Sequence, residues 1–210
     1  FNADGAVDFA YPSAGGVTVL MNANTDMANT GVGFSVTVPT TQDTTDESNE
    51  TVPLTIGGVT ATGTIIDDDS APTIKSVEPG QPGTGDDSVT EGSPLTFNVN
   101  LSNPSDKPVT FPFNLGGGTA GQGDIGKPVF SDGVVLNDDG TITVPAGLTS
   151  FTVTVPTTQD TTQESSETVP LTIGGVTATG TIVDDDGKPT ITRIEPGDLV
   201  AVDDKVPEGT

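Results

Sequence analysis

Apolar and polar residues alternate along the whole length of Leu95-Thr96-Phe97-Asn98-Val99-Asn100-Leu101. This alternation is typical of a β-strand with one face in a core and the other in water. The same two-residue period returns over residues 109–115, 142–144, 151–155, 169–173 and 176–182, and a first strand is expected near 74–77. No segment shows a helical period. The sequence therefore predicts an all-β protein.

About seven such strands, separated by Gly, Pro, Asn and Asp, are the pattern of an immunoglobulin-like β-sandwich. The alternative is a disordered chain, since only 31% of the residues are apolar and acids are abundant. The regular alternation favours the folded state.

Residues 35–69 recur as residues 152–186, at a constant offset that takes Ser35 to Thr152. The two copies differ only at Ser35/Thr152, Asp46/Gln163, Asn49/Ser166 and Ile66/Val183. Such identity is typical of a tandem array. We expect residues 1–71 to be the C-terminal part of a first sandwich, 72–188 to be a complete second one, and 189–210 to begin a third.

The charge and composition exclude several classes of function. Thirty acidic residues against six basic ones give a net charge of −24, so nucleic acid and anionic membranes are poor partners. The chain has no Cys and no His, which removes disulfides, zinc sites and His-based catalysis.

Carboxylate pairs can hydrolyse glycosides, but a chain without Trp and with one Tyr offers little for a sugar to stack on. No apolar run is long enough to enter a bilayer as a spanning helix. A non-enzymatic protein is expected.

The up-and-down strand order predicts that most of the acidic residues lie at one end of the complete unit. Successive reversals send to that end the loop with Glu91, the long connection with Asp124, the loop 156–168 and the terminal triplet Asp184-Asp185-Asp186. The opposite end receives Asp106, beside Lys107. The acidic end of one unit should therefore face an almost neutral end of the next.

Converging carboxylates are the ligands that Ca²⁺ prefers, whereas Mg²⁺ demands stricter octahedral geometry and usually keeps its waters. A single Asp in a turn is more simply a solvated turn residue. The triplet 184–186 taken together with the other acidic loops favours calcium, because three adjacent anions repel one another unless a cation lies among them.

At these residues the chain resembles the Calx-β domain. The resemblance is carried by Val89-Thr90-Glu91-Gly92, Asp124 after a Gly-rich connection, and the segments 145–155, 160–168 and 179–186. With near-identical copies and acidic junctions, the units look most like the extender repeats of giant calcium-dependent RTX adhesins of Gram-negative bacteria. The resemblance implies calcium ligands at Glu91, Asp124, Asp160, Glu164, Asp184, Asp185 and Asp186, and at the matching Asp43, Glu47, Asp67, Asp68 and Asp69 of the first unit. The loop Thr158-Gln159-Asp160-Thr161-Thr162 carries less acid than in family members with more sites, so fewer ions per unit are expected.

The expected function is that of an extracellular spacer in a large bacterial surface adhesin, supporting cell adhesion and biofilm formation. Its partners would be calcium and the neighbouring repeats, with the adhesive target bound elsewhere in the full protein. One alternative is a sandwich that itself binds a glycan or peptide, and another is an accessory domain of an enzyme. Near-identical copies favour a repeated mechanical part, because a recognition module usually has loops of its own and exposed aromatic residues.

Overall fold

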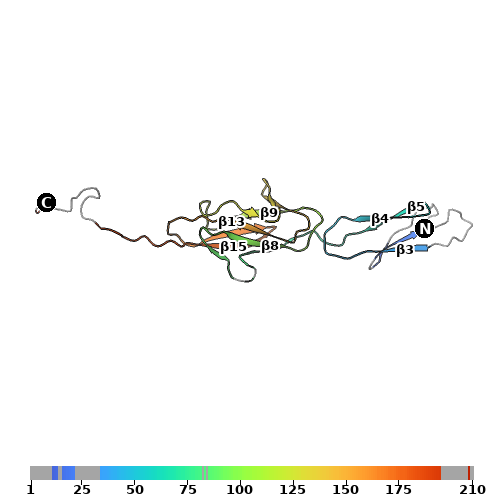
Figure 1. Cartoon of the computed structure of the whole chain (residues 1–210), viewed down its shortest axis with the longest axis horizontal. Coiled ribbons are helices and arrows are strands. Elements are labelled where there is room, and N and C mark those ends of the chain that lie inside the picture. The colour runs from blue at the N-terminus through green and yellow to red at the C-terminus, as the bar shows by residue number, and fades with distance from the viewer. Residues whose placement is uncertain are drawn as a thin grey trace, which may run out of the picture.

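The computed structural model describes residues 11–13, 16–21, 34–81, 83, 85–194 and 208, and this part of the chain is all-β, as predicted (Figure 1). Its fifteen strands are β1 (Tyr11–Ser13), β2 (Gly16–Met21), β3 (Phe34–Pro39), β4 (Glu50–Ile56), β5 (Val59–Ile65), β6 (Ile74–Pro79), β7 (Ser88–Thr90), β8 (Leu95–Leu101), β9 (Val109–Leu115), β10 (Val129–Phe130), β11 (Val135–Leu136), β12 (Thr141–Val144), β13 (Ser150–Val155), β14 (Glu167–Ile173) and β15 (Val176–Val183). Within the same residues there is no helix long and apolar enough to cross a membrane.

The second unit is a β-sandwich made of strands β6 to β15. One sheet has the order β10-β13-β8-β6 and the other has the order β11-β12-β9-β14-β15-β7. The strands predicted from alternation are β6, β8, β9, β12, β13, β14 and β15. Three short strands were not predicted. Of these, β7 is important for the site, because it leaves the sheet of β6 and pairs in parallel with β15.

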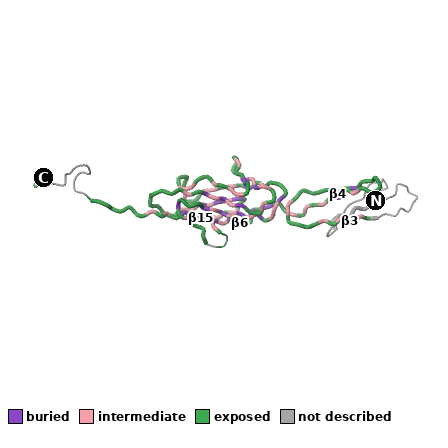
Figure 2. Tube along the Cα trace, viewed as in Figure 1, coloured by how far each residue is buried: buried purple, intermediate pink, exposed green. Residues whose placement is uncertain are grey.

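The core of the sandwich is formed by the alternate residues that the sequence pattern marks. Phe97 and Val99 of β8 are 0% exposed, as are Leu171 and Ile173 of β14 in the facing sheet. Burying a side chain of this kind stabilises the fold by about 1.5–3 kcal/mol. Figure 2 shows this buried layer inside the second unit, with exposed loops at both ends. The core therefore fixes the strands whose ends carry the acidic loops.

The first unit repeats the same hairpin in a more open setting. Strands β4 and β5 pair in the same register as β14 and β15. Ile56 is 37% exposed, however, whereas its counterpart Ile173 is fully buried. In the second unit β9 pairs with β14, and among the described residues of the first unit no strand pairs with β4 except β5. Identical sequences are thus buried to different extents by their neighbours.

The two units follow one another lengthwise, as Figure 1 shows. The end of the first unit that carries its Asp67-Asp68-Asp69 triplet lies against the end of the second unit that carries the β8–β9 loop, residues 102–108. The acidic loops of the second unit lie at its opposite end, where the chain continues past Asp186. We call this opposite end the acidic pole of the second unit.

Candidate metal centre

Two groups of three carboxylates meet at the acidic pole. Glu91, Asp184 and Asp186 form the first group, and Asp124, Glu164 and Glu167 form the second. In each group the carboxylate oxygens that face one another lie within 4.8 Å. That separation is short enough for one cation to contact all three side chains, since calcium–oxygen distances are about 2.3–2.6 Å.

The first group is assembled by the parallel pairing of β7 with β15. Glu91 directly follows β7, and its backbone N–H donates to the carbonyl of Val183, the last residue of β15 (3.1 Å). The triplet begins at the next residue, Asp184. The pairing therefore brings the Glu91 carboxylate, which is only 7% exposed, beside Asp184 and Asp186.

Gln159 connects three segments of the pole. Its Nε2 donates to Oε1 of Glu91 and to Oδ1 of Asp185, both at 2.9 Å. Gly92 allows this close approach, because it has a φ of 76° and a Cβ there would lie 2.8 Å from Oε1 of Gln159. The amide of Gln159 thus holds two acidic segments together with a neutral donor.

The second group is held by the loop that precedes β14. Asp160 caps this loop, since its Oδ1 accepts from the Thr162 N–H at 2.6 Å. Further along, the Glu164 N–H donates to Oδ2 of Asp184 at 3.1 Å, which joins the loop to the triplet. Asp124 arrives from the long connection, and its carbonyl accepts from the Thr158 N–H at 2.8 Å. The two groups are therefore neighbours within one acidic surface.

Burial, together with the neighbouring acidic residues, raises the pKa of the glutamates at this pole. Burial is the main cause at Glu91, followed by the charges of Asp186, Asp160 and Asp184, and together they raise its pKa from 4.5 to about 7. Burial followed by neighbouring acids also raises the pKa of Glu164 and of Glu167. Each of these groups is more stable with a proton, or with a nearby cation, than as a bare carboxylate.

Asp186 provides the most specific indication of a ligand. Its Oδ2 is buried, and it has no hydrogen-bond partner among the described residues. A buried carboxylate oxygen without a partner is costly, because it has lost its hydration and gained nothing in return. The side chains that the two groups offer to a metal are all carboxylates, so the residues fit a hard divalent cation better than a soft one.

The structure places the predicted residues of the second unit in three situations. It brings Glu91, Asp184 and Asp186 into the first group, and Asp124 and Glu164 into the second. Asp160 and Asp185 lie at the same pole but belong to neither group, and both serve there as hydrogen-bond acceptors. Glu167 was not among the predicted ligands. Its sequence signals are its place in the loop 156–168, which was predicted to lie at this end, and the matching Glu50 in the first copy.

The first unit repeats the hydrogen-bonded frame of this pole. Gln42 donates to Asp68 (2.8 Å), Asp43 caps the Thr45 N–H (2.7 Å), and the Glu47 N–H donates to Asp67 (3.2 Å). Burial and neighbouring acids raise the pKa of Glu47 and of Asp69. No group of three carboxylates forms among the described residues of this unit. The described part lacks counterparts of Glu91 and Asp124, which complete the two groups in the second unit.

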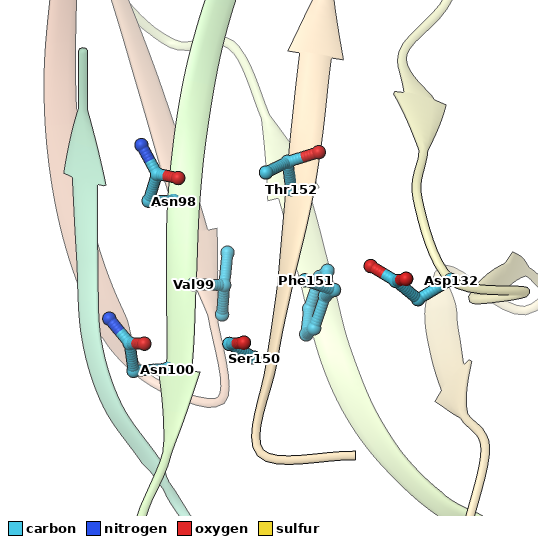
Figure 3. A pocket seen from close by; sticks show the side chains of 7 residues that line it. All are labelled: Asn98, Val99, Asn100, Asp132, Ser150, Phe151 and Thr152. Atoms are coloured by element: carbon cyan, nitrogen blue, oxygen red, sulfur yellow. The ribbon is translucent and has the colours of Figure 1, made fainter. Parts of the chain in front are cut away.

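A separate depression lies on the four-stranded sheet, away from the acidic pole (Figure 3). Its volume is about 190 Å³, and it is lined by Asn98, Val99, Asn100, Asp132, Ser150, Phe151 and Thr152. Asp132 is the one charged residue in this lining. None of the predicted metal ligands contributes to it.

Comparison with known proteins does not identify the chain. No protein-family model matches it, and no curated protein matches it. Among solved structures, domains 4–9 of the surface layer protein SbsC align with 90% of this chain and 30% of that chain, at 16% identity and a TM-score of 0.33. This chain thus spans less than a third of the length of that structure. Function is therefore inferred from the residues of the site.

Proposed function

We propose that this chain is a calcium-binding spacer segment of a large bacterial surface adhesin. The repeats act as a non-enzymatic, extracellular extender that holds an adhesive region away from the cell and so supports adhesion and biofilm formation. The target of adhesion is bound elsewhere in the full protein. This proposal joins the resemblance to Calx-β extender repeats with the chemistry of the acidic pole.

The observation that carries the proposal is the buried, unpartnered Oδ2 of Asp186 within a group of three carboxylates. Solvated turn acids, the simpler explanation, do not account for a carboxylate oxygen that is removed from water and left without a donor. A calcium ion would supply the missing positive partner. Glu91, Asp184 and Asp186 would hold one ion, and Asp124, Glu164 and Glu167 a second.

The first group includes Asp186, which directly precedes the expected link to the next unit, so an ion bound there would affect how the repeats are spaced. Asp186 is followed by Gly187-Lys188-Pro189, the expected link to the next unit. Pro189 restricts one backbone angle of this link. An ion held by Asp186 and Glu91 would tie the start of the link to the body of the sandwich. The next repeat would then leave each unit in a fixed direction.

The test is a titration of metal-depleted protein with calcium, followed by calorimetry and by thermal unfolding. With a Kd of about 10⁻⁴ M and several millimolar calcium, each site should stabilise the fold by roughly 2 kcal/mol. Replacing Asp184 and Asp186 by Asn should abolish the stabilisation from the first group. It should not weaken the metal-free protein, because repulsion is relieved.

The matched control is Asp138→Asn, which removes a charge from an exposed position outside both groups. This variant should keep the full calcium effect. The proposal fails if excess EGTA leaves the melting temperature of the native chain unchanged. Equal stabilisation by magnesium would point to general screening of the negative charge.

A further inference from the structure

The joint between the two units is built from direct contacts between two loops. We call residues 43–48 of the first unit the presenting loop and residues 102–107 of the second unit the receiving loop. Asp46 and Ser105 form a parallel β-bridge across the joint. The Asp46 N–H donates to the carbonyl of Pro104 at 3.1 Å, and the Asp106 N–H donates to the carbonyl of Asp46 at 2.9 Å.

Side chains add to this bridge. The Ser105 hydroxyl donates to Oδ2 of Asp46 at 2.9 Å, and it accepts from the Lys107 N–H at 3.3 Å. Lys107 Nζ donates to the hydroxyl of Ser48 in the presenting loop. Lys107 also lies 3.9 Å from Asp106, so one cation offsets part of the acid that meets here.

Ser105 is 4% exposed, although it lies in a polar loop at the end of the sandwich. Its carbonyl accepts from the Gly147 N–H at 2.9 Å, and its hydroxyl is used by Asp46 and Lys107. Every polar group of its side chain is thus satisfied by the joint or by its own loop. A buried hydroxyl with a dedicated acceptor across the joint specifies one orientation of the two loops.

The link between the units is drawn into the same contact. Asn103 Nδ2 donates to the carbonyl of Ser70 at 2.8 Å. Pro72, two residues further along the link, is buried. The link between the two described units is therefore held by the receiving loop at Ser70.

One of the four differences between the copies falls on this contact. Asp46 becomes Gln163 in the second unit, whereas the neighbouring Ser48 is kept as Ser165. Gln is neutral and one methylene longer, so it cannot offer Ser105 the same charged acceptor at the same reach. Gln163 instead donates to the carbonyl of Glu164 in its own loop at 2.8 Å.

We propose that the receiving loop is a docking site for the presenting loop of the preceding repeat, and that the residue at position 46 determines how firmly the joint is held. A repeat with Asp at this position makes a fixed joint, and a repeat with Gln makes a looser one. The partner of the receiving loop is thus a second copy of the repeat. The receiving loop recognises it by the carboxylate of Asp46 and the hydroxyl of Ser48. This inference goes beyond the proposed function and does not depend on which ion the acidic pole takes.

The test measures the distance between the units by double electron–electron resonance. The chain has no Cys, so nitroxide labels at Thr62→Cys and Thr179→Cys, which are exposed and equivalent positions in the two copies, would be the only ones. The native chain should give one narrow distance distribution in calcium. Asp46→Gln, which installs the residue of the other copy, and Ser105→Ala should each lose the narrow peak.

The matched control is Gln163→Asp, which makes the reverse change where no receiving loop follows within residues 164–210. It should leave the distribution as narrow as in the native chain. A second readout is the Asp106 amide, which should exchange with solvent faster in both joint variants.

The inference is overturned if both variants keep the native distribution and the native exchange rate, or if the native distribution is broad in every buffer. A repeat of the measurement in EGTA separates the two proposals. A distribution that stays narrow in EGTA but broadens in Asp46→Gln supports the docking site and contradicts a calcium-set joint at this position. A distribution that is narrow only in calcium, and then equally narrow in Asp46→Gln, contradicts the docking site.

Discussion

Glu91 is the residue at which burial and charge conflict most strongly. It is held near Asp184 and Asp186 by the pairing of β7 with β15, and its pKa is raised to about 7. The Oδ2 atom of Asp186 is also buried among these acids, and no hydrogen-bond donor contacts it among the described residues. A proton at low pH relieves the strain at Glu91, and a cation at neutral pH would relieve it at both residues.

A pH dependence of stability follows from Glu91. Its folded-state pKa of about 7 lies above its ordinary value of 4.5, so the folded chain binds the proton more tightly than the unfolded chain does. The metal-free protein should therefore lose stability as the pH rises from 4.5 through 7. Melting temperatures of metal-depleted protein across this range measure the effect. Glu91→Gln should flatten the profile, and an equal slope in the variant would assign the effect to other groups.

Many residues of the candidate metal site could be predicted from the sequence. Glu91, Asp124, Glu164, Asp184 and Asp186 lie in loops whose ends follow from counting strand reversals. Glu167 lies in the predicted loop 156–168 and so at the predicted end, but it was not chosen as a ligand, because its role depends on the register that makes it the first residue of β14, paired with Ile182. Register depends on contacts between strands, and these are not visible in the alternation of a single segment.

Strand β7 shows why some elements escaped prediction. Its three residues are too few to display a period, and its place is determined by the edge of β15 that accepts it. The seven longer strands carry enough apolar alternation to be predicted one by one. The unpredicted strand is the one that delivers Glu91 to the first group, so the fold was more accessible from sequence than the assembly of the site.

Gly92, which follows Glu91 two residues after the end of β7, offers a test of how Glu91 is positioned. Gly92→Ala places a Cβ at a φ of 76° and 2.8 Å from Oε1 of Gln159, so it should strain the turn and displace the amide that holds Glu91 and Asp185. We expect a stability loss of about 1–3 kcal/mol together with weaker calcium binding, measured by urea unfolding and calorimetry. Gly140→Ala is the control, since Gly140 has a φ of 81° and nothing within 4 Å of a Cβ. If both variants bind calcium equally well, the Gln159 contact has no role in the site.

The two copies of the hairpin, β4–β5 and β14–β15, allow the effect of burial on local opening to be compared. Residues 50–65 and 167–182 have the same sequence, but Leu171 and Ile173 are fully buried and Ile56 is not. The amides of β4 and β5 should exchange with deuterium faster than those of β14 and β15, because fewer buried contacts oppose their opening. NMR is the suitable method, since both hairpins give peptides of identical mass. Equal protection of the two hairpins would contradict the burial difference.

Along the length of the molecule, the acidic residues are concentrated at one end of each described unit. The acidic triplet of each described unit lies at the end from which the chain proceeds to the next unit. At the joint, Lys107 of the second unit donates to Ser48 of the presenting loop. The sequence predicted this alternation of acidic and nearly neutral ends. The sequence could not predict the bridge between Asp46 and Ser105, because a contact between units depends on the folded shapes of both units.

The most direct test of a calcium-held spacer is small-angle scattering of a chain of several complete repeats that carry Gln at position 163. Such joints lack the Asp46 carboxylate, so the ions at the acidic pole should contribute most to their stiffness. The maximum dimension should be large and well defined in calcium, and it should become smaller and less defined in EGTA. Equal dimensions in the two buffers, with calcium shown to bind, would contradict a calcium-held spacer, because the ions would then stabilise single repeats without setting the length of the array.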